Sequence, residues 1–186
     1  MKSSEYNEID EYIRNTWFKD HEAGYTSLPS METLTWANPK RSAYRVTYHA
    51  HEDILYVTGD LGYAIYRAGL ESLKEWSECY LDYFSGKCVA SELGAQYLEW
   101  DSDYLKEEVK TVLEGYDKDW DSFVAKSGDL STGNELEWIQ WLSENGSDFF
   151  GYDRFNWPLN GKRISVRCKG QLIGLKMAIE KIDEDI

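Results

Sequence analysis

The residues of this chain that look most like a reaction centre lie in the run His49-Ala50-His51-Glu52-Asp53. Alternating histidines on a strand, followed by an aspartate, form the H-x-H-x-D core of some binuclear metal hydrolases, because imidazole and carboxylate groups are good metal ligands. The match is incomplete, since those sites continue with a histidine where this chain has Ile54, and His21 is the only other histidine. We interpret the run as polar residues at a hairpin end and keep one alternative, a small metal-dependent hydrolase using His49, His51 and Asp53.

Other enzyme signatures are missing from the sequence. It contains no GxxxxGK[ST] phosphate loop, no GxGxxG after a strand and no GxSxG nucleophile elbow. Gly59-Asp60-Leu61-Gly62 is typical of a turn. Cys79, Cys88 and Cys168 form no CxxC pair, which favours reduced thiols that are buried or half-buried. We therefore expect no enzymatic activity and no cofactor, although a Cys/His pair brought together by the fold stays open.

Acidic residues are concentrated in the middle of the chain. Residues 71–153 hold 20 acidic and 6 basic residues, so their net charge of −14 equals that of the whole chain. Such a segment is either a solvated helical face or a surface that imitates nucleic acid, because exposed carboxylates partly reproduce the charge density of DNA. Free nucleic acid and anionic membranes are poor partners for it. A basic host protein or a nucleoprotein is the expected partner.

Within this segment many carboxylates surround a helix whose apolar stripe occupies one side, so most of them should project into solvent. Complementary charge speeds association, and nearby tryptophans would slow dissociation. The predicted partner-binding residues are Glu99, Trp100, Asp101, Asp103, Glu107, Glu108, Asp117, Asp119, Trp120 and Asp121.

Aromatic residues are frequent, with 8 Trp, 14 Tyr and 6 Phe among 186 residues, and most of them should be core. One helical stripe is formed by Leu136, Ile139 and Leu142. Trp138 and Trp141 lie off that stripe, and residues 149–157 crowd five more aromatics between Gly and Asn. Exposed aromatics beside carboxylates suit protein binding, so this region is a second candidate interface, and a homo-oligomer stays open.

The elements that position these residues begin with a sheet. Aromatic or β-branched residues alternate with other residues over 44–49, and β-branched and aromatic residues also fill the runs 54–58 and 63–67. This pattern predicts three strands joined by short hairpin connections. Residues 23–42, which include Pro29 and Pro39, have neither period and are expected to be a long surface connection. The predicted sheet is a small three-stranded antiparallel meander over about residues 43–67.

Helices are expected on both sides of this meander. The first runs from about Ser4 to Asp20, and another begins at the capping box Ser72-Leu73-Lys74-Glu75. Leu81, Phe84 and Cys88 indicate a third helix. Apolar residues at helical spacing after Asp101 or Ser102 predict a long fourth helix.

Two more helices complete the prediction. One begins at a second capping box, Thr132-Gly133-Asn134-Glu135, and ends at Asn145-Gly146; the other carries the stripe from Leu172 to Ile182. The fold class is therefore α+β, a small sheet covered by several helices. A chain of 186 residues suits a single domain over 1–186, with a weak seam near residues 128–133. The first residues lack the pattern of a signal peptide and no apolar run spans a membrane, so a cytoplasmic protein is expected.

Two stretches of the sequence, Tyr44 to Arg67 and Tyr83 to Glu92 followed by Glu99-Trp100-Asp101, resemble small proteins encoded by phages and prophages. They cover about a fifth of the chain, and Leu172 to Ala178 adds a third, shorter stretch. This group of proteins resembles type II anti-CRISPR proteins. The resemblance implies a phage protein in the bacterial cytoplasm that inhibits a Cas9-type effector by occupying a basic nucleic-acid-binding surface without catalysis. A phage regulatory protein with another host target is the alternative.

Overall fold

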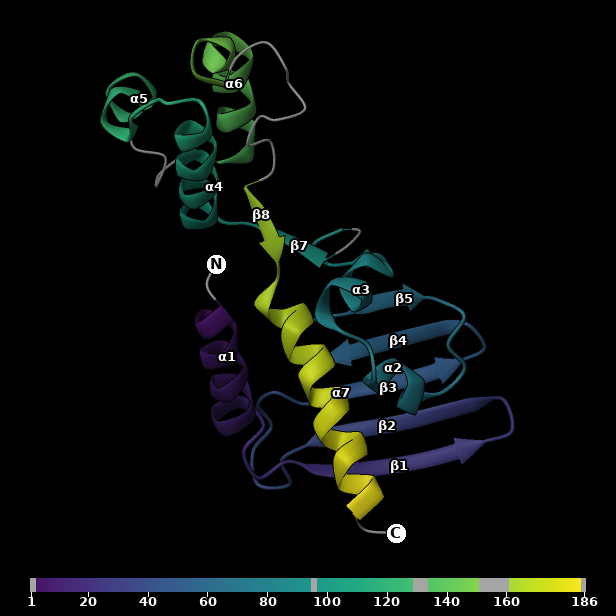
Figure 1. Cartoon of the computed structure of the whole chain (residues 1–186). Coiled ribbons are helices and arrows are strands. Elements are labelled where there is room, and N and C mark those ends of the chain that lie inside the picture. The colour runs from purple at the N-terminus through teal and green to yellow at the C-terminus, as the bar shows by residue number, and fades with distance from the viewer. Residues whose placement is uncertain (1–2, 95–96, 129–133, 151–160, 185–186) are drawn as a thin grey trace. The chain divides into compact units, whose positions relative to one another are not determined.

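The computed structural model describes residues 3–94, 97–128, 134–150 and 161–184 (Figure 1). The chain forms two compact units: unit 1 is Met1–Leu98 with Ile164–Ile186, and unit 2 is Glu99–Arg163. The chain passes from one unit to the other within the paired strands β7 (Leu98–Trp100) and β8 (Lys162–Ile164). Unit 2 is therefore an insertion in unit 1. The seam expected near residues 128–133 falls inside unit 2, and residues 129–133 lie outside the described ranges.

Unit 1 is built on a six-stranded sheet in which each strand is antiparallel to the next and the strand order follows the chain. The strands are β1 (Glu22–Leu28), β2 (Met31–Ala37), β3 (Val46–His51), β4 (Ile54–Gly59), β5 (Ala64–Arg67) and β6 (Cys88–Ser91). The α+β class is confirmed. The three-stranded meander predicted from the sequence corresponds to β3–β5 alone.

The prediction of a surface connection over residues 23–42 is wrong, because most of this segment is the hairpin β1–β2. Nearly all residues of the edge strand β1 are exposed, so β1 has no apolar alternation to detect. Pro29 lies in the turn between the two strands, where a missing N–H costs no ladder hydrogen bond. The third predicted helix is also too long, since α3 (Leu81–Gly86) ends before Cys88, which belongs to β6.

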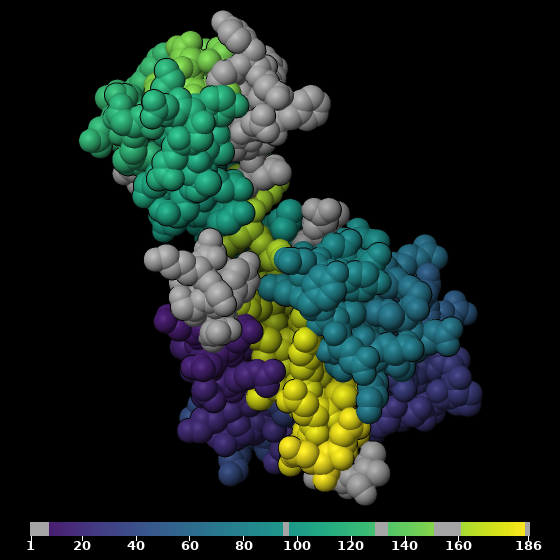
Figure 2. All heavy atoms as spheres, viewed as in Figure 1, coloured from purple at the N-terminus to yellow at the C-terminus, as the bar shows by residue number. Residues whose placement is uncertain are grey.

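One face of the sheet is covered by helices. Alternate residues of the inner strands are buried there, including Tyr48 on β3, Val57 on β4 and Tyr66 on β5. The long helix α7 (Val166–Glu184) crosses this face, and Figure 2 shows it between the purple first helix and the teal segment that holds α2 (Leu73–Ser77) and α3. The core of unit 1 therefore lies between the sheet and these helices.

Most of the predicted helix starts are confirmed in unit 1. The first helix is α1 (Ser3–Tyr12), which continues as the π-helical segment η1 (Ile13–Trp17). Ser72 and Glu75 form the expected capping box before α2. All three cysteines are free and buried, as predicted. None of the helices in the described ranges combines the length and apolar character of a membrane span.

Unit 2 contains three helices, α4 (Ser102–Gly115), α5 (Trp120–Ser127) and α6 (Glu135–Phe150), and has a core of its own. Asn134 and Glu137 exchange hydrogen bonds at the start of α6, whereas Thr132 lies outside the described residues. The predicted end of this helix at Asn145-Gly146 is wrong, because α6 continues to Phe150. The buried core side chains of unit 2 are Leu105, Val109, Leu113, Phe123, Trp138, Leu142 and Phe150.

Candidate functional site

The histidine run lies on the face of the sheet opposite α7. Strand β3 is regular, and alternate residues on it are buried, so His49 and His51 share the other face. His49 shares a hydrogen bond of 3.0 Å with the hydroxyl of Thr33 on β2. Asp53 lies in the next turn, where its Oδ2 accepts a hydrogen bond of 2.8 Å from Nε of Arg67.

This hydrogen bond from Arg67 holds the pKa of Asp53 below its usual value. Asp53 is therefore paired with the guanidinium group of Arg67, which compensates the charge of the carboxylate. In the part of the chain that the structure describes, no three His, Cys, Asp or Glu side chains are grouped closely enough to hold a metal ion. Among these described residues the metal-hydrolase alternative therefore finds no ligand set.

The acidic surface of unit 2 is the stronger candidate. This unit of 65 residues contains 15 acidic and 7 basic residues. The exposed carboxylates on α4, on α5 and in the connection between them belong to Asp103, Glu107, Glu114, Asp117, Asp119 and Asp121. Five of these six are among the residues predicted from the sequence.

Two predicted carboxylates also cap helices. Oδ1 of Asp101 accepts hydrogen bonds of 2.9 Å from the main-chain N–H groups of Asp103 and Tyr104 at the start of α4. Its Oδ2 lies 2.7 Å from Nε of Arg163. Asp119 caps α5 through Ser122, and these hydrogen bonds lower the pKa of Asp119. Both aspartates therefore help to fold unit 2, and replacing either would change structure as well as charge.

The carboxylates of three other predicted residues are either paired with a basic residue or partly buried. Glu99 lies 3.9 Å from the guanidinium of Arg163. Glu107 is exposed and pairs with Lys110 at 2.8 Å, which lowers its pKa. Glu108 is partly buried, and desolvation raises its pKa. The acidic surface is consequently smaller than the sequence suggests, because Glu99 and Glu108 contribute little exposed charge.

The two tryptophans predicted as partner anchors pack inside unit 2. Trp100 lies over Gly161, where a Cβ would come within 2.9 Å of its ring. Trp120 stacks on Phe123 with ring centroids 5.5 Å apart, and Nζ of Lys110 lies 5.2 Å from its ring. Both side chains are half-buried against the core, so only part of each ring faces solvent.

The apolar stripe expected on α6 is wrong for two of its three residues, since Leu142 is buried but Leu136 and Ile139 are not. Trp138 is 3% exposed and belongs to the core, and Trp141 stacks on it, whereas Leu136 is 74% exposed and Ile139 48%. Burial of the larger aromatic area outweighs burial of the aliphatic stripe. The exposed pair Leu136 and Ile139 was missed, because in the sequence it looks like core.

The second predicted interface, residues 149–157, is only partly described. Phe149 is half-buried and Phe150 is fully buried in the core of unit 2. The predicted aromatics Tyr152, Phe155 and Trp157 lie outside the described residues.

Comparison of the chain with protein-family models, with curated proteins and with solved structures finds no match.

Proposed function

We propose that this chain is a binding protein that places the acidic surface of unit 2 on a basic protein surface that otherwise holds nucleic acid. The observation that carries the proposal is the run from Glu114 to Asp121, which includes the carboxylates of Glu114, Asp117, Asp119 and Asp121. All four residues are exposed, and in the described ranges no lysine or arginine nitrogen lies within 4.0 Å of their oxygens.

The run contains one exposed lysine, Lys118, and the other described basic residues of unit 2 pair with carboxylates outside the run. Lys110 pairs with Glu107, Lys126 with Asp148, and Arg163 with Asp101. The charge of the run is therefore available to a partner. A basic channel that binds a polyanion has the complementary potential, and desolvating one surface against the other would fix the orientation of the complex.

Charge alone gives fast but weak association, so the interface also needs apolar contact. Leu136 and Ile139 supply it on α6, since they lie almost one turn apart and are both exposed. The acidic residues Glu137 and Glu144 are exposed on the same helix. An apolar pair beside carboxylates suits a basic surface that has an apolar pocket.

The specific partner that we propose is a Cas9-type effector loaded with guide RNA, and its inhibition requires no catalysis. The resemblance of the 44–67 and 83–92 segments to phage proteins supports this choice. The acidic run supports it independently, because such an effector holds its nucleic acid in a positively charged channel.

The test uses a variant in which four exposed carboxylates that cap no helix become amides: Asp103→Asn, Glu114→Gln, Asp117→Asn and Asp121→Asn. A matched control neutralises four exposed carboxylates of unit 1: Glu22→Gln, Glu71→Gln, Glu78→Gln and Asp82→Asn. Both variants lose the same formal charge. Binding to guide-loaded Cas9 and inhibition of DNA cleavage are measured at rising salt.

We expect the wild type and the control to bind and inhibit, with affinity that falls as salt rises, and the unit 2 variant to bind at least about tenfold more weakly. Equal loss in both variants would mean that net charge alone drives binding. If no form of the protein binds, the Cas9 assignment is wrong.

A further inference from the structure

Unit 1 carries a cluster of basic residues that the acidic unit 2 does not explain. Most lysines and arginines in the described ranges lie within 4.0 Å of a carboxylate. Lys19, Lys40, Arg41 and Arg45 are exposed, and no described carboxylate oxygen comes within 4.0 Å of their side-chain nitrogens. Four like charges in one region repel one another, so the region is suited to an anion from outside.

The local fold brings these four residues together. Nδ2 of Asn38 donates a hydrogen bond of 3.1 Å to the carbonyl of Lys19, which ties the turn after η1 to the loop after β2. Oδ1 of Asn38 accepts a hydrogen bond of 2.8 Å from the N–H of Lys40. The loop borders an open hollow of about 400 Å³ lined by Ala37, Asn38, Pro39, Lys40, Arg41, Ser42 and Arg45.

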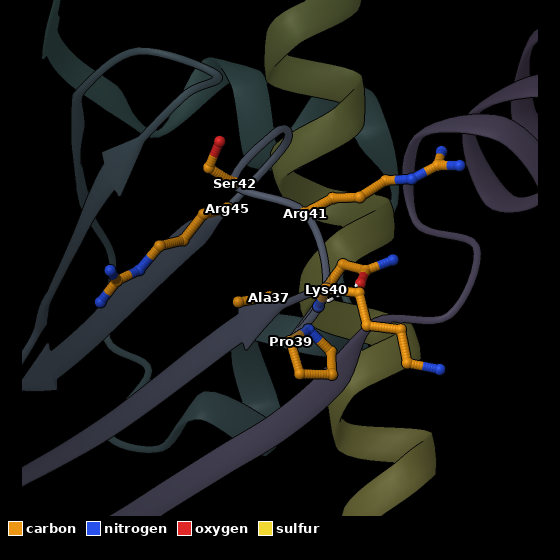
Figure 3. Close-up of a pocket in the computed structure, with 7 residues that line it drawn as sticks. Ala37, Pro39, Lys40, Arg41, Ser42 and Arg45 are labelled. Carbon is orange, nitrogen blue, oxygen red and sulfur yellow. Dashed lines mark hydrogen bonds between the residues drawn. The ribbon is translucent and has the colours of Figure 1, made fainter.

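The basic side chains spread over both sides of this loop. Figure 3 shows Lys40 and Arg41 directed to one side and Arg45 to the other. One small anion could not contact all three. An extended anion that crosses the loop would meet a positive charge on each side.

Aromatic rings adjoin the cluster and give it a second kind of contact. Tyr44, next to Arg45, stacks on Trp17 with the ring centroids 5.0 Å apart and the planes 5° apart. Tyr12 meets the edge of Trp17 at 6.5 Å and is 56% exposed. An exposed ring beside cations provides a surface on which a nucleobase can stack.

The backbone at Tyr44 is strained, which is unusual for a bulky residue. Its φ is +62°, in the left-handed region that favours glycine. The stack on Trp17 holds it, and Nε2 of His21 donates a hydrogen bond of 3.2 Å to its carbonyl. Strain that the surroundings maintain in this way is concentrated at binding sites.

From this geometry we infer that residues 12–21 and 37–45 form a binding site for single-stranded nucleic acid. The phosphates lie against Lys19, Lys40, Arg41 and Arg45, and a base stacks on Tyr12. A duplex is less suitable because its base faces are covered, and a peptide of acidic residues alone has no rings that could stack on the aromatic surface. The site is independent of the proposed function of unit 2.

The net charge of −14 opposes this binding only over short distances. At physiological salt, exposed charges separated by more than about 8 Å are largely screened, so the local cluster decides. Acidic residues adjacent to the site in sequence are Glu11, beside Tyr12, and Asp20 and Glu22, after Lys19, and Asp60 contacts Arg45. Oδ2 of Asp60 accepts a hydrogen bond of 2.9 Å from the main-chain N–H of Arg45, and this bond limits the freedom of that carboxylate.

The test measures fluorescence anisotropy of labelled oligothymidine and oligouridine of about 12 nucleotides with the full chain and no protein partner. A duplex of the same length and unlabelled polyglutamate serve as competitors. The site variant is Arg41→Glu with Arg45→Glu. The matched control is Lys118→Glu with Lys181→Glu, two exposed cations outside the cluster. A third pair, Tyr12→Ala and Tyr12→Phe, separates stacking from charge.

We expect the wild type to bind the single strands with a log–log salt slope of about −2 to −3, as three or four phosphate contacts require. The site variant should bind at least about tenfold more weakly, and the control within about twofold of the wild type. Tyr12→Ala should weaken binding about fivefold or more, and Tyr12→Phe should restore it. The inference is overturned if the wild type does not bind, if the control loses as much as the site variant, or if duplex or polyglutamate competes as well as a single strand.

Discussion

The hydroxyl of Tyr48, at the centre of β3, donates a hydrogen bond of 2.8 Å to the main-chain carbonyl of Gln171 on α7. The side chain of Gln171 makes two more hydrogen bonds. Its Oε1 accepts one of 2.7 Å from the hydroxyl of Tyr66, and its Nε2 donates one of 3.1 Å to the carbonyl of Leu61. Gln171 is fully buried. A buried amide with satisfied donor and acceptor atoms fixes the position of α7 on the sheet, because another placement would leave polar groups unpaired.

We expect Gln171→Leu to lower the free energy of unfolding by about 1–3 kcal/mol, because the hydroxyl of Tyr66 loses its acceptor inside the core. The carbonyl of Leu61 also loses a hydrogen bond, but it still accepts one from the hydroxyl of Tyr97, so this loss costs less free energy. Urea unfolding followed by circular dichroism measures the change. Gln140→Leu, on the exposed side of α6, is the control and should stay within about 0.5 kcal/mol of the wild type.

Gly174→Ala should destabilise unit 1 by about 1–3 kcal/mol. A Cβ at this position would lie 2.7 Å from the hydroxyl of Tyr48 and 2.9 Å from the ring of Phe18, so α7 would have to move away from the sheet. Gly86→Ala, at the end of α3, meets no atom within 4 Å and should be close to neutral. Equal thermal midpoints for the two variants would show that α7 does not pack this closely.

Stability should fall at alkaline pH. Burial raises the pKa of Cys168 to about 12 and that of Tyr66 well above its ordinary value. The unfolded chain releases the proton of Cys168 above about pH 9 and that of Tyr66 above about pH 10, whereas the folded chain keeps both. Above its unfolded pKa each group therefore costs about 1.4 kcal/mol per pH unit until its folded pKa is reached. Urea midpoints between about pH 8 and pH 11 measure the slope, and Cys168→Ser should make it shallower. A midpoint independent of pH over this range would contradict the burial of these groups.

Asp119→Ala should destabilise the start of α5 by about 1 kcal/mol, because the main-chain N–H of Ser122 loses its acceptor. Asp121→Ala removes the same charge two residues later without removing the cap. Hydrogen exchange at Ser122 and Phe123 distinguishes them, with faster exchange expected in Asp119→Ala alone. Similar protection in the two variants would assign Asp119 to the surface only.

Trp138→Ala should cost about 3–5 kcal/mol, because it opens the core of unit 2. Leu136→Ala, two residues earlier, should change stability by less than about 0.5 kcal/mol, because that side chain is 74% exposed. Unfolding followed by tryptophan fluorescence and by circular dichroism measures both. The opposite order of effects would restore the stripe inferred from the sequence.

The sequence predicted those elements whose signals are local. Ser72 and Glu75 mark the start of α2 by side-chain chemistry alone, and alternation marks β3 because one face of it is buried. Strand β1 gave no such signal, since hydrogen bonds to β2 hold it and nearly all of its residues are exposed. The buried face of α6 is set by the contact of Trp138 with Phe123 and other aromatic rings. The spacing of apolar residues along one helix does not predict where the rings of another helix lie.

Of the two candidate sites, the acidic surface was predicted from the sequence and the basic cluster was not. The acidic surface was predicted from charge density, but the roles of Asp101 and Asp119 as caps appear only in the structure. The basic cluster of unit 1 was not predicted, because Lys19 and Arg41 are distant in sequence and the hydrogen bond from Asn38 to Lys19 joins their two segments only in the folded chain.

The insertion of unit 2 also sets the order in which the chain can fold during synthesis. The sheet of unit 1 is translated before α7, and the whole of unit 2 lies between them. The part of the apolar face that α7 covers therefore stays exposed while about 65 residues are added at roughly 5–20 residues per second. Unit 2 is contiguous and has its own core, so it can fold during that interval. Slow translation of this chain would prolong the aggregation-prone stage of unit 1 and leave unit 2 unaffected.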